Sequence, residues 1–344
     1  MTLKIAIVDD LEMTVEVLKR LVLSVSEYKI VWTAKNGVEA VKKCAADVPD
    51  LILMDLIMPV MDGVEATRQI MKNSPCAILV VTATVEGNMS KIFEAMGCGA
   101  LDVVATPVLG SEGNVEGAKE LLTKIATIGK LIGKTSKEEQ KIKKYKQTSG
   151  EAQIPPFIAI GSSTGGPKAL ADILSQLPKN FNASIAVVQH VDFKFAAGLV
   201  EWLDRQTHLK VLLAKEKMSP KSGVVFVAGT NDHLIITPDF TFAYTSEPRN
   251  LSYRPSVDIF FKSVALNWPE EAAAVLLTGM GTDGAEGLKN LRKAGWYTIS
   301  QDKDTSVVYG MPKAAAMLRA AVDILPLEEI APALVKYYTK KTKH

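Results

Sequence analysis

Three side chains that lie far apart in the chain could together perform acyl transfer: Ser163, His190 and Asp283. Ser163 is the central residue of a G-x-S-x-G motif at 161–165, between the apolar run 157–160 and a helical pattern. A serine hydroxyl becomes a nucleophile when a base removes its proton, and the base needs a carboxylate to orient it. The chemistry of such a set is hydrolysis through a covalent acyl-serine intermediate.

The position of each histidine decides which one can act as the base. His190 directly follows the apolar run 184–188 and Gln189, at the carboxyl edge of the expected sheet, where Ser163 also lies. His208 and His233 come just before their apolar runs, which predicts that they lie at the amino edge, and His344 is the last residue. His190 is therefore the candidate base.

Two aspartates could orient His190. Asp283 follows the apolar run 272–277 in a glycine-rich loop, again at the carboxyl edge, and is favoured. Asp258 is the alternative, but Pro255 and Ser256 before it are typical of a helix start, which favours a structural role. The order serine, histidine, aspartate differs from the orders of α/β-hydrolases and of the common serine proteases, and indicates a separate hydrolase family.

Each motif has a simpler explanation when taken alone. The glycine-rich loop around Ser163 could bind a phosphate, His190 could be a buried histidine bonded to the backbone, and the loop around Asp283 could be only a turn. Their shared placement after strands of one sheet favours the hydrolytic interpretation.

A second cluster of polar side chains follows the apolar runs of the N-terminal third of the chain. Asp9 and Asp10 follow the first run, Asp55 the third, Thr82 the fourth and Thr106 the fifth. Converging carboxylates repel one another unless a cation lies among them, and oxygen ligands suit Mg²⁺. A carboxylate beside Mg²⁺ can accept a phosphoryl group. The alternative is that Asp9 and Asp10 only cap a helix.

The positions of the apolar runs predict the fold. In the first part of the chain they are 4–8, 29–33, 51–54, 77–81 and 102–105. In the second part they are 157–160, 184–188, 210–214, 224–228, 233–237 and 272–277, with 241–246 as an edge hairpin strand. Because helical patterns separate most of these runs, we expect an α/β protein with two doubly wound, mostly parallel sheets.

Length and composition set the domain organisation. The 344 residues suggest a domain at 1–125, a charged, lysine-rich linker at 126–153 and a domain at 154–344. A net charge of +2 gives no argument for nucleic-acid binding, and we expect no membrane-inserted segment. The three cysteines form no C-x-x-C motif, and we expect them to be reduced thiols of a cytoplasmic protein.

The N-terminal part resembles the flavodoxin-like receiver domain of bacterial response regulators. The resemblance lies in IVDD (7–10), LMDLIMPVMDG (53–63), VVTA (80–83) and GALDVVATP (99–107). It implies that Asp55 accepts the phosphoryl group, that Asp9, Asp10 and Asp55 hold Mg²⁺, and that Thr82 is the switch hydroxyl. It also implies a chemotaxis histidine kinase as phosphodonor.

Two residues depart from the receiver pattern. Thr106 stands where receivers usually carry the lysine that contacts the phosphoryl group, and Val103 stands where they carry an aromatic switch residue. Threonine cannot supply the positive charge of the lysine. We therefore expect weak or altered activation by phosphodonors.

The second part resembles the Rossmann-like catalytic domain of chemotaxis protein-glutamate methylesterases. The resemblance lies in GSSTGGP (161–167), QH (189–190), RPSVD (254–258) and LTGMGTDG (277–284). It implies that Ser163 is the nucleophile, His190 the general base and Asp283 the orienting carboxylate, with the Met280 backbone N–H at the oxyanion site and no cofactor for the esterase.

The resemblance also supplies the substrate and its control. It implies hydrolysis of glutamate γ-methyl esters on the cytoplasmic helices of chemoreceptors, with glutamine deamidation as a second reaction, gated by the receiver. The loop 191–195 (VDFKF) lacks the proline and glycine usual in the family, which leaves hydrolysis of another ester or amide open. A non-enzymatic adaptor that binds receptors is the third interpretation.

Overall fold

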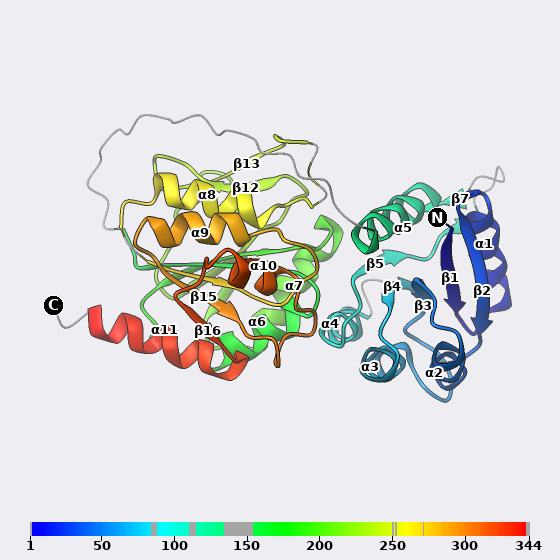
Figure 1. The fold of residues 1–344 in the computed structure, drawn as a ribbon. Coiled ribbons are helices and arrows are strands. Elements are labelled where there is room, and N and C mark those ends of the chain that lie inside the picture. Colours follow the sequence, from blue (N-terminus) through cyan, green and yellow to red (C-terminus); the bar gives the residue numbers. More distant parts are fainter. Residues whose placement is uncertain are drawn as a thin grey trace. The chain divides into compact units, whose positions relative to one another are not determined.

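A computed structural model describes residues 2–83, 88–109, 115–133, 154–249, 251, 253–270 and 272–341. The chain forms two compact units, Met1–Glu138 and Glu139–His344, and each is described by itself (Figure 1). The last helix of the first unit, α5, spans Ala118–Ile132 and so continues beyond the expected domain end at residue 125. The remainder of the expected linker, 134–153, lies outside the described residues, as does His344.

The first unit has a five-stranded parallel sheet in the order β2-β1-β3-β4-β5. Its strands are β1 (Leu3–Val8), β2 (Tyr28–Ala34), β3 (Leu51–Met54), β4 (Ala77–Thr82) and β5 (Asp102–Ala105). Each predicted apolar run is one of these strands, and the order is that of flavodoxin-like folds. The predicted fold of this part is confirmed.

Five helices cover this sheet. They are α1 (Glu12–Leu23), α2 (Gly37–Ala46), α3 (Gly63–Asn73), α4 (Met89–Gly97) and α5. α1 contacts α5, and α3 contacts both α2 and α4, so that the sheet lies between two helical layers. A short antiparallel pair, β6 (Val108–Leu109) and β7 (Val115–Glu116), precedes α5.

The second unit has a seven-stranded parallel sheet in the order β10-β11-β9-β8-β14-β15-β16. Its strands are β8 (Phe157–Ser162), β9 (Ser184–Gln189), β10 (Lys210–Leu213), β11 (Val224–Val227), β14 (Ala273–Leu276), β15 (Tyr297–Gln301) and β16 (Asp323–Leu325). After β8 the chain first forms the strands on the β9 side (β9 to β11) and then those on the β14 side (β14 to β16). The topological switch point, where open α/β sheets bind ligands, therefore lies at the carboxyl end of β8.

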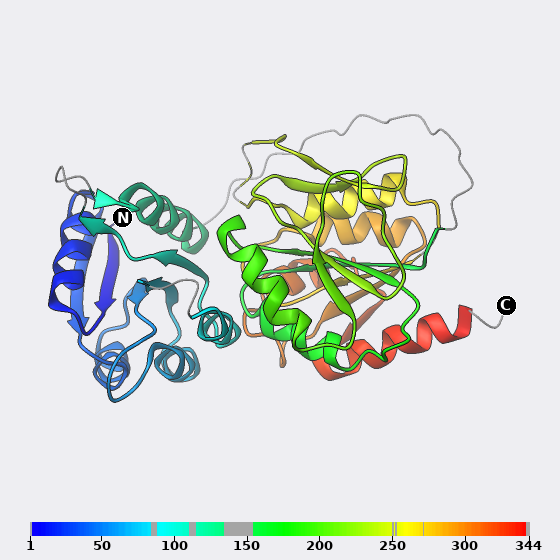
Figure 2. The ribbon, with the colours of Figure 1, turned by 180° about the vertical axis from the view of Figure 1, so that it is seen from behind.

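The helices of this unit form layers on the two faces of the sheet (Figures 1 and 2). They are α6 (Gly166–Ser175), α7 (Phe193–Asp204), α8 (Val257–Asn267), α9 (Ala285–Lys293), α10 (Met311–Met317) and α11 (Leu327–Lys341). α6 contacts α7 and α11, whereas α9 contacts α8 and α10. Among the described residues, no helix combines the length and the apolar character needed to cross a membrane.

Two details of the second unit differ from the sequence-based expectation. The run 233–237 is not part of the main sheet, because β12 (His233–Ile236) pairs antiparallel with β13 (Phe242–Thr245) in a separate hairpin packed on α8. The run 241–246 is therefore a hairpin strand, but it does not lie at the edge of the main sheet. β15 and β16 were not anticipated, because Ser300 and Gln301 interrupt the apolar pattern of the first and the second has three residues.

Candidate active site

Ser163 lies in a tight turn between β8 and α6. Its N–H donates to the Thr278 carbonyl (3.1 Å), and its carbonyl accepts from the Gly166 N–H (2.8 Å), the first residue of α6. A Cβ at Gly279 would lie 2.6 Å from the Ser163 Cβ, so only glycine allows this close approach. The predicted strand–turn–helix context of the serine is present.

Gln189 connects the serine turn to the end of β9. Its Nε2 donates to the carbonyls of Ser163 (2.9 Å) and His190 (3.0 Å), and its Oε1 accepts from the Ser162 hydroxyl (2.7 Å). The His190 N–H donates to the Ser162 carbonyl (3.0 Å). Sequence reasoning assigned Gln189 no role, although its place directly before His190 on a buried strand was a signal.

The structure brings His190 and Asp283 into direct contact. His190 Nε2 lies 2.9 Å from Asp283 Oδ2, and the two side chains are 6% and 12% exposed. The ring of Tyr253 stacks on the imidazole with centroids 4.3 Å apart and planes 6° apart. His190 directly follows β9 and Asp283 lies in the loop after β14, and these two strands are the neighbours of β8, which Ser163 follows.

The second ring nitrogen of His190 has the character expected of a base. Nδ1 is buried and has no hydrogen-bond partner in the part of the chain that the structure describes. Buried polar atoms are nearly always paired, so an exception needs an explanation. Because the carboxylate accepts the Nε2 proton, Nδ1 carries the lone pair and can take a proton.

The N-terminus of α8 holds the Asp283 carboxylate. Oδ1 accepts from the Ser256 hydroxyl (2.8 Å) and the Asp258 N–H (3.1 Å), and Oδ2 accepts from the Val257 N–H (2.6 Å). Burial by itself raises the pKa of Asp283, but the hydrogen bonds from His190, Ser256 and Val257 outweigh burial and hold this pKa below its ordinary value. Asp283 is therefore kept ionised beside the imidazole.

Asp258, the alternative orienting residue, has a different partner. One of its carboxylate oxygens accepts from the Gly287 N–H in the first turn of α9 (2.6 Å). It therefore links α8 to α9, and Asp283 alone of the two aspartates is bonded to His190 among the described residues. Burial and the nearby charge of Asp283 raise the pKa of Asp258 to about 7.

The loop after β14 carries Met280, the predicted oxyanion donor. The residue before Met280 is held in place, since the Gly279 carbonyl accepts from the N–H groups of Gly310 (3.1 Å) and Met311 (2.8 Å). The Met280 N–H donates to no other residue within the described ranges. It is thus available for a ligand oxygen.

His233 lies beside the residues that hold Asp283, although its place before an apolar run predicts the amino edge of the main sheet. It was assigned to the amino edge of the sheet because it precedes an apolar run, but β12 lies outside that sheet. Its Nδ1 accepts from the Ser256 N–H (3.0 Å), so that it adjoins the residues that hold Asp283. A local pattern cannot reveal this contact, which joins residues 23 positions apart.

In the first unit, the carboxyl ends of adjacent strands carry the predicted acidic and hydroxyl residues. Asp9 follows β1, Asp55 follows β3 and Thr82 ends β4, and the Thr106 N–H donates to the Thr82 carbonyl (3.0 Å). Val103 is fully buried in β5 and is a core residue.

The three aspartates at this edge interact through their charges. Within the described ranges, no three His, Cys, Asp or Glu side chains are placed to hold a metal ion together. Asp9 is buried, whereas Asp10, which follows it in a bend after β1, is partly exposed. The set of Asp9, Asp10 and Asp55 stays a prediction for the Mg²⁺ ligands.

Asp9 and Asp55 nevertheless suit a hard cation. Burial raises the pKa of Asp55 to about 6, and the charge of Asp9 adds to the effect. Burial also raises the pKa of Asp9 to about 6, although the Leu11 N–H bonded to it (2.8 Å) opposes this. Mg²⁺ commonly takes only one or two carboxylates and keeps several waters, so this pair fits it.

Comparison with known proteins finds a matching family for each of the two units. The family described as CheB methylesterase matches residues 158–334, and the response regulator receiver domain matches residues 5–113. A Pseudomonas fluorescens strain Pf0-1 protein named protein-glutamate methylesterase/protein-glutamine glutaminase 1 is 53% identical over 98% of this chain and 100% of its own length. This chain belongs to the CheB methylesterase family.

Other relatives extend the likeness within the CheB family. A Mesorhizobium japonicum protein-glutamate methylesterase/protein-glutamine glutaminase is 51% identical over 99% of this chain and 100% of its own length. The crystal structure of the Thermotoga maritima CheB methylesterase catalytic domain matches with a TM-score of 0.51 and 36% identity, over 53% of this chain and 98% of that one.

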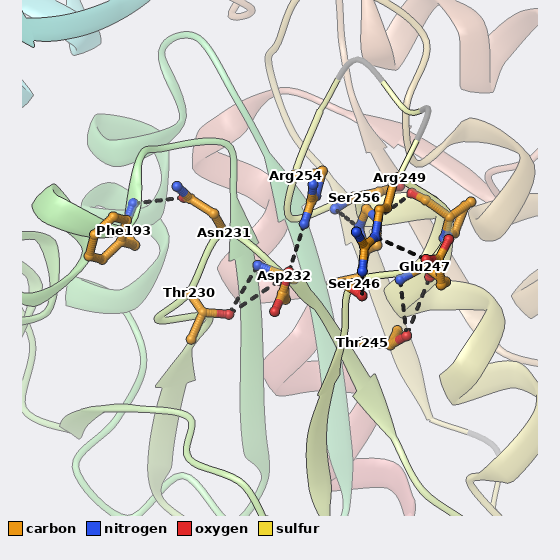
Figure 3. A network of polar contacts seen from close by, with 12 residues as sticks. Phe193, Thr230, Asn231, Asp232, Thr245, Ser246, Glu247, Arg249, Arg254 and Ser256 are labelled. Carbon is orange, nitrogen blue, oxygen red and sulfur yellow. Dashed lines mark hydrogen bonds and ion pairs between the residues drawn. The ribbon is translucent and has the colours of Figure 1, made fainter. Parts of the chain in front are cut away.

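The segment after His190 and the segment before β12 share polar contacts in the catalytic unit (Figure 3). The Phe193 N–H donates to Asn231 Oδ1 (3.0 Å), and the Phe193 side chain is 50% exposed. In the same network, Arg254 donates to Asp232 (2.7 Å). The divergent segment 191–195 therefore runs into α7, and Phe193, the first residue of that helix, exposes its ring beside this polar network.

The raised pKa of Asp258 predicts a pH-dependent stability. A carboxyl group whose folded pKa lies above its unfolded pKa stabilises the fold fully below the unfolded value, and this contribution is lost as the pH rises to about 7. In Asp258→Asn the side chain is neutral at every pH. The free energy of unfolding of the wild type minus that of the variant should therefore decrease between about pH 4 and pH 7. A difference that does not change with pH would contradict this assignment.

Proposed function

We propose that this chain hydrolyses the γ-methyl esters of glutamate side chains on the cytoplasmic helices of chemoreceptors and releases methanol. The observation that carries the proposal is the hydrogen bond between His190 and Asp283. It leaves the buried Nδ1 of His190 without a partner within the described residues, at the carboxyl edge of the sheet where Ser163 also lies. The names of the curated relatives supply the substrate class. A site in the cytoplasm follows from this substrate.

The mechanism assigns one task to each side chain. His190 Nδ1 takes the proton of the Ser163 hydroxyl while the oxygen attacks the ester carbonyl, and Asp283 stabilises the imidazolium that forms. The Met280 N–H donates to the oxyanion of the tetrahedral intermediate. The imidazolium returns the proton to the leaving methoxide, so that methanol departs and an acyl-serine remains.

Water completes the cycle. His190 takes a proton from the water as it attacks the acyl-serine, and gives it to the Ser163 oxygen when the glutamate carboxylate is released. A glutamine side chain passes through an equivalent intermediate with ammonia as leaving group. We therefore include deamidation as a second reaction, in line with the relatives' names.

The decisive experiment measures methanol released from receptor membranes that carry labelled methyl groups. The full-length protein should release methanol, and a preparation of unmethylated glutamine-containing receptor should yield ammonia. Hydrolysis of small model esters together with no methanol from receptors would instead favour another ester or amide substrate, which the divergent loop with its exposed Phe193 allows.

We further propose that the receiver unit accepts a phosphoryl group on Asp55 from a chemotaxis histidine kinase and gates the esterase. Asp9, Asp10 and Asp55 would hold Mg²⁺, which neutralises phosphoryl oxygens during transfer when it is bound. The Asp55 carboxylate is the nucleophile, and Thr82 at the end of β4 is the hydroxyl that responds to the phosphoryl group. If the receiver restrains the esterase, a 150–344 fragment should be more active than the full chain.

Thr106 and Val103 predict a weak response to phosphorylation. A small phosphodonor should stimulate methanol release by the wild type only slightly, since no lysine contacts the phosphoryl group from position 106. A hydrogen bond to a charged group contributes about 1.5–3 kcal/mol, so Thr106→Lys should strengthen the response by on the order of tenfold. Asp55→Ala is the control and should abolish any response. Strong stimulation of the wild type that disappears in Asp55→Ala would contradict the prediction.

A further inference from the structure

The His233 ring donates one hydrogen bond and accepts another. It is fully buried, and its Nε2 lies 3.1 Å from the Pro248 carbonyl, which can only accept. The ring therefore carries its proton on Nε2, and its Nδ1 accepts from the Ser256 N–H (3.0 Å). The His233 imidazole is thus fixed as a neutral acceptor toward Ser256.

Ser256 is the N-cap of α8 and the first of three consecutive residues that hold Asp283. Its hydroxyl donates to Asp283 Oδ1 and accepts from the Ile259 N–H (3.3 Å), while the next two N–H groups also point to the carboxylate. The first N–H groups of a helix lack partners within the helix, so their direction decides what they bind. The only other donor of this segment, the Ser256 N–H, is fixed by His233.

We propose, on the basis of the function proposed above, that His233 is a positioning residue for the esterase. By accepting the Ser256 N–H it orients the start of α8, so that the Ser256 hydroxyl and the Val257 and Asp258 N–H groups converge on Asp283 and keep this carboxylate aligned with His190 Nε2. The chain of contacts runs from His233 through the α8 N-terminus and Asp283 to the catalytic imidazole. His233 touches neither substrate nor nucleophile in this scheme.

Burial favours the neutral form of His233 that this role requires. Burial lowers the pKa of His233 most; the Pro248 carbonyl opposes this, the positive charge of Arg254 lowers the pKa further, and Asp283 and Asp232 raise it. Arg254 is paired with Asp232 (2.7 Å), in the network of Figure 3 that also includes Ser256. A proton on Nδ1 would remove the acceptor and face the Ser256 N–H with a second donor.

Two substitutions separate positioning from mere structural support. His233→Asn keeps an acceptor at the place of Nδ1 but loses the donor to Pro248. His233→Gln keeps a donor at the place of Nε2 but loses the acceptor for Ser256. In full-length protein, kcat and KM for methanol release are measured together with the thermal unfolding of each variant.

The positioning role predicts that the two variants differ. His233→Gln should lower kcat by on the order of 10²-fold with KM unchanged, as expected when a catalytic group is misplaced, and His233→Asn should recover most of this loss. Equal loss in both variants, in proportion to their unfolding temperatures, or no loss in either, would overturn the proposal.

Two further measurements keep the test independent of folding and of substrate. If a variant does not fold, a nitrogen NMR spectrum of the wild type decides, because a proton on His233 Nδ1 at the pH of maximal turnover would refute the role. The rate at which a fluorophosphonate probe labels Ser163 reports on the same alignment without the receptor. Labelling without methanol release would reject the proposed substrate, while the order of labelling rates still tests His233.

Discussion

Replacing Ser163 with alanine should lower methanol release from methylated receptor membranes by on the order of 10⁴-fold or more. The hydroxyl forms the bond to the acyl group, and the remaining oxyanion donor and base cannot replace a covalent intermediate. The measurement is kcat/KM for methanol release by the wild type and by Ser163→Ala at equal protein concentration. Equal rates would remove the esterase assignment and favour an adaptor that only binds receptors.

Ser162→Ala is the matched control, because it removes the same hydroxyl one residue earlier. Ser162 is fully buried and its hydroxyl donates to Gln189 Oε1. Its loss leaves a buried acceptor unpaired, which costs about 1–3 kcal/mol of stability, but most of the turnover should remain. If Ser162→Ala were as inactive as Ser163→Ala while still folded, the identity of the nucleophile would be open.

Replacing Asp283 with asparagine should lower kcat by roughly 10³–10⁴-fold. The Ser256 hydroxyl and the Asp258 N–H would bind the amide oxygen in the place of Oδ1, so the amide NH₂ would replace Oδ2 and face both His190 Nε2 and the Val257 N–H. His190 Nε2 would then have to accept, and the proton would move to Nδ1, where it blocks proton transfer from Ser163. The negative charge that stabilises the imidazolium would also be lost.

Asp258→Asn is the control for this substitution. It makes the same chemical change in the neighbouring carboxylate, which bonds to Gly287 and is easily protonated, with a pKa of about 7. Turnover should therefore change little. A larger loss of kcat in Asp258→Asn than in Asp283→Asn would reverse the assignment of the orienting carboxylate. The two variants together decide an alternative that the sequence left open.

Sequence patterns predicted much of the fold and the candidate triad for a simple physical reason. Buried parallel strands are short apolar runs, and their carboxyl ends all meet at one edge, so the residue after each run is placed without knowledge of the strand order. Ser163, His190 and Asp283 were found in this way. The same rule misplaced His233, because β12 forms an antiparallel hairpin outside the sheet to which the rule applies.

The receiver unit shows where this rule reaches its limit. The strands and their order are as expected, but the neighbours Asp9 and Asp10 differ in burial, since Asp9 is buried and Asp10 is partly exposed. The end of a strand fixes where the backbone of a residue lies, whereas metal coordination also depends on the direction of each side chain. The substitutions at Thr106 and Val103, in contrast, were visible in the sequence, because they concern residue type alone.

The sequence by itself determined the two α/β units, the chemistry of each strand edge and the residue types that serve it. Only the tertiary structure decided that Nε2 of His190 bonds to Asp283 and that Asp258 instead joins α8 to α9. It also decided that His233 accepts a hydrogen bond from Ser256, which holds the Asp283 carboxylate. These features depend on hydrogen bonds between segments distant in the chain. Their geometry is set by how helices and hairpins pack, which no local pattern encodes.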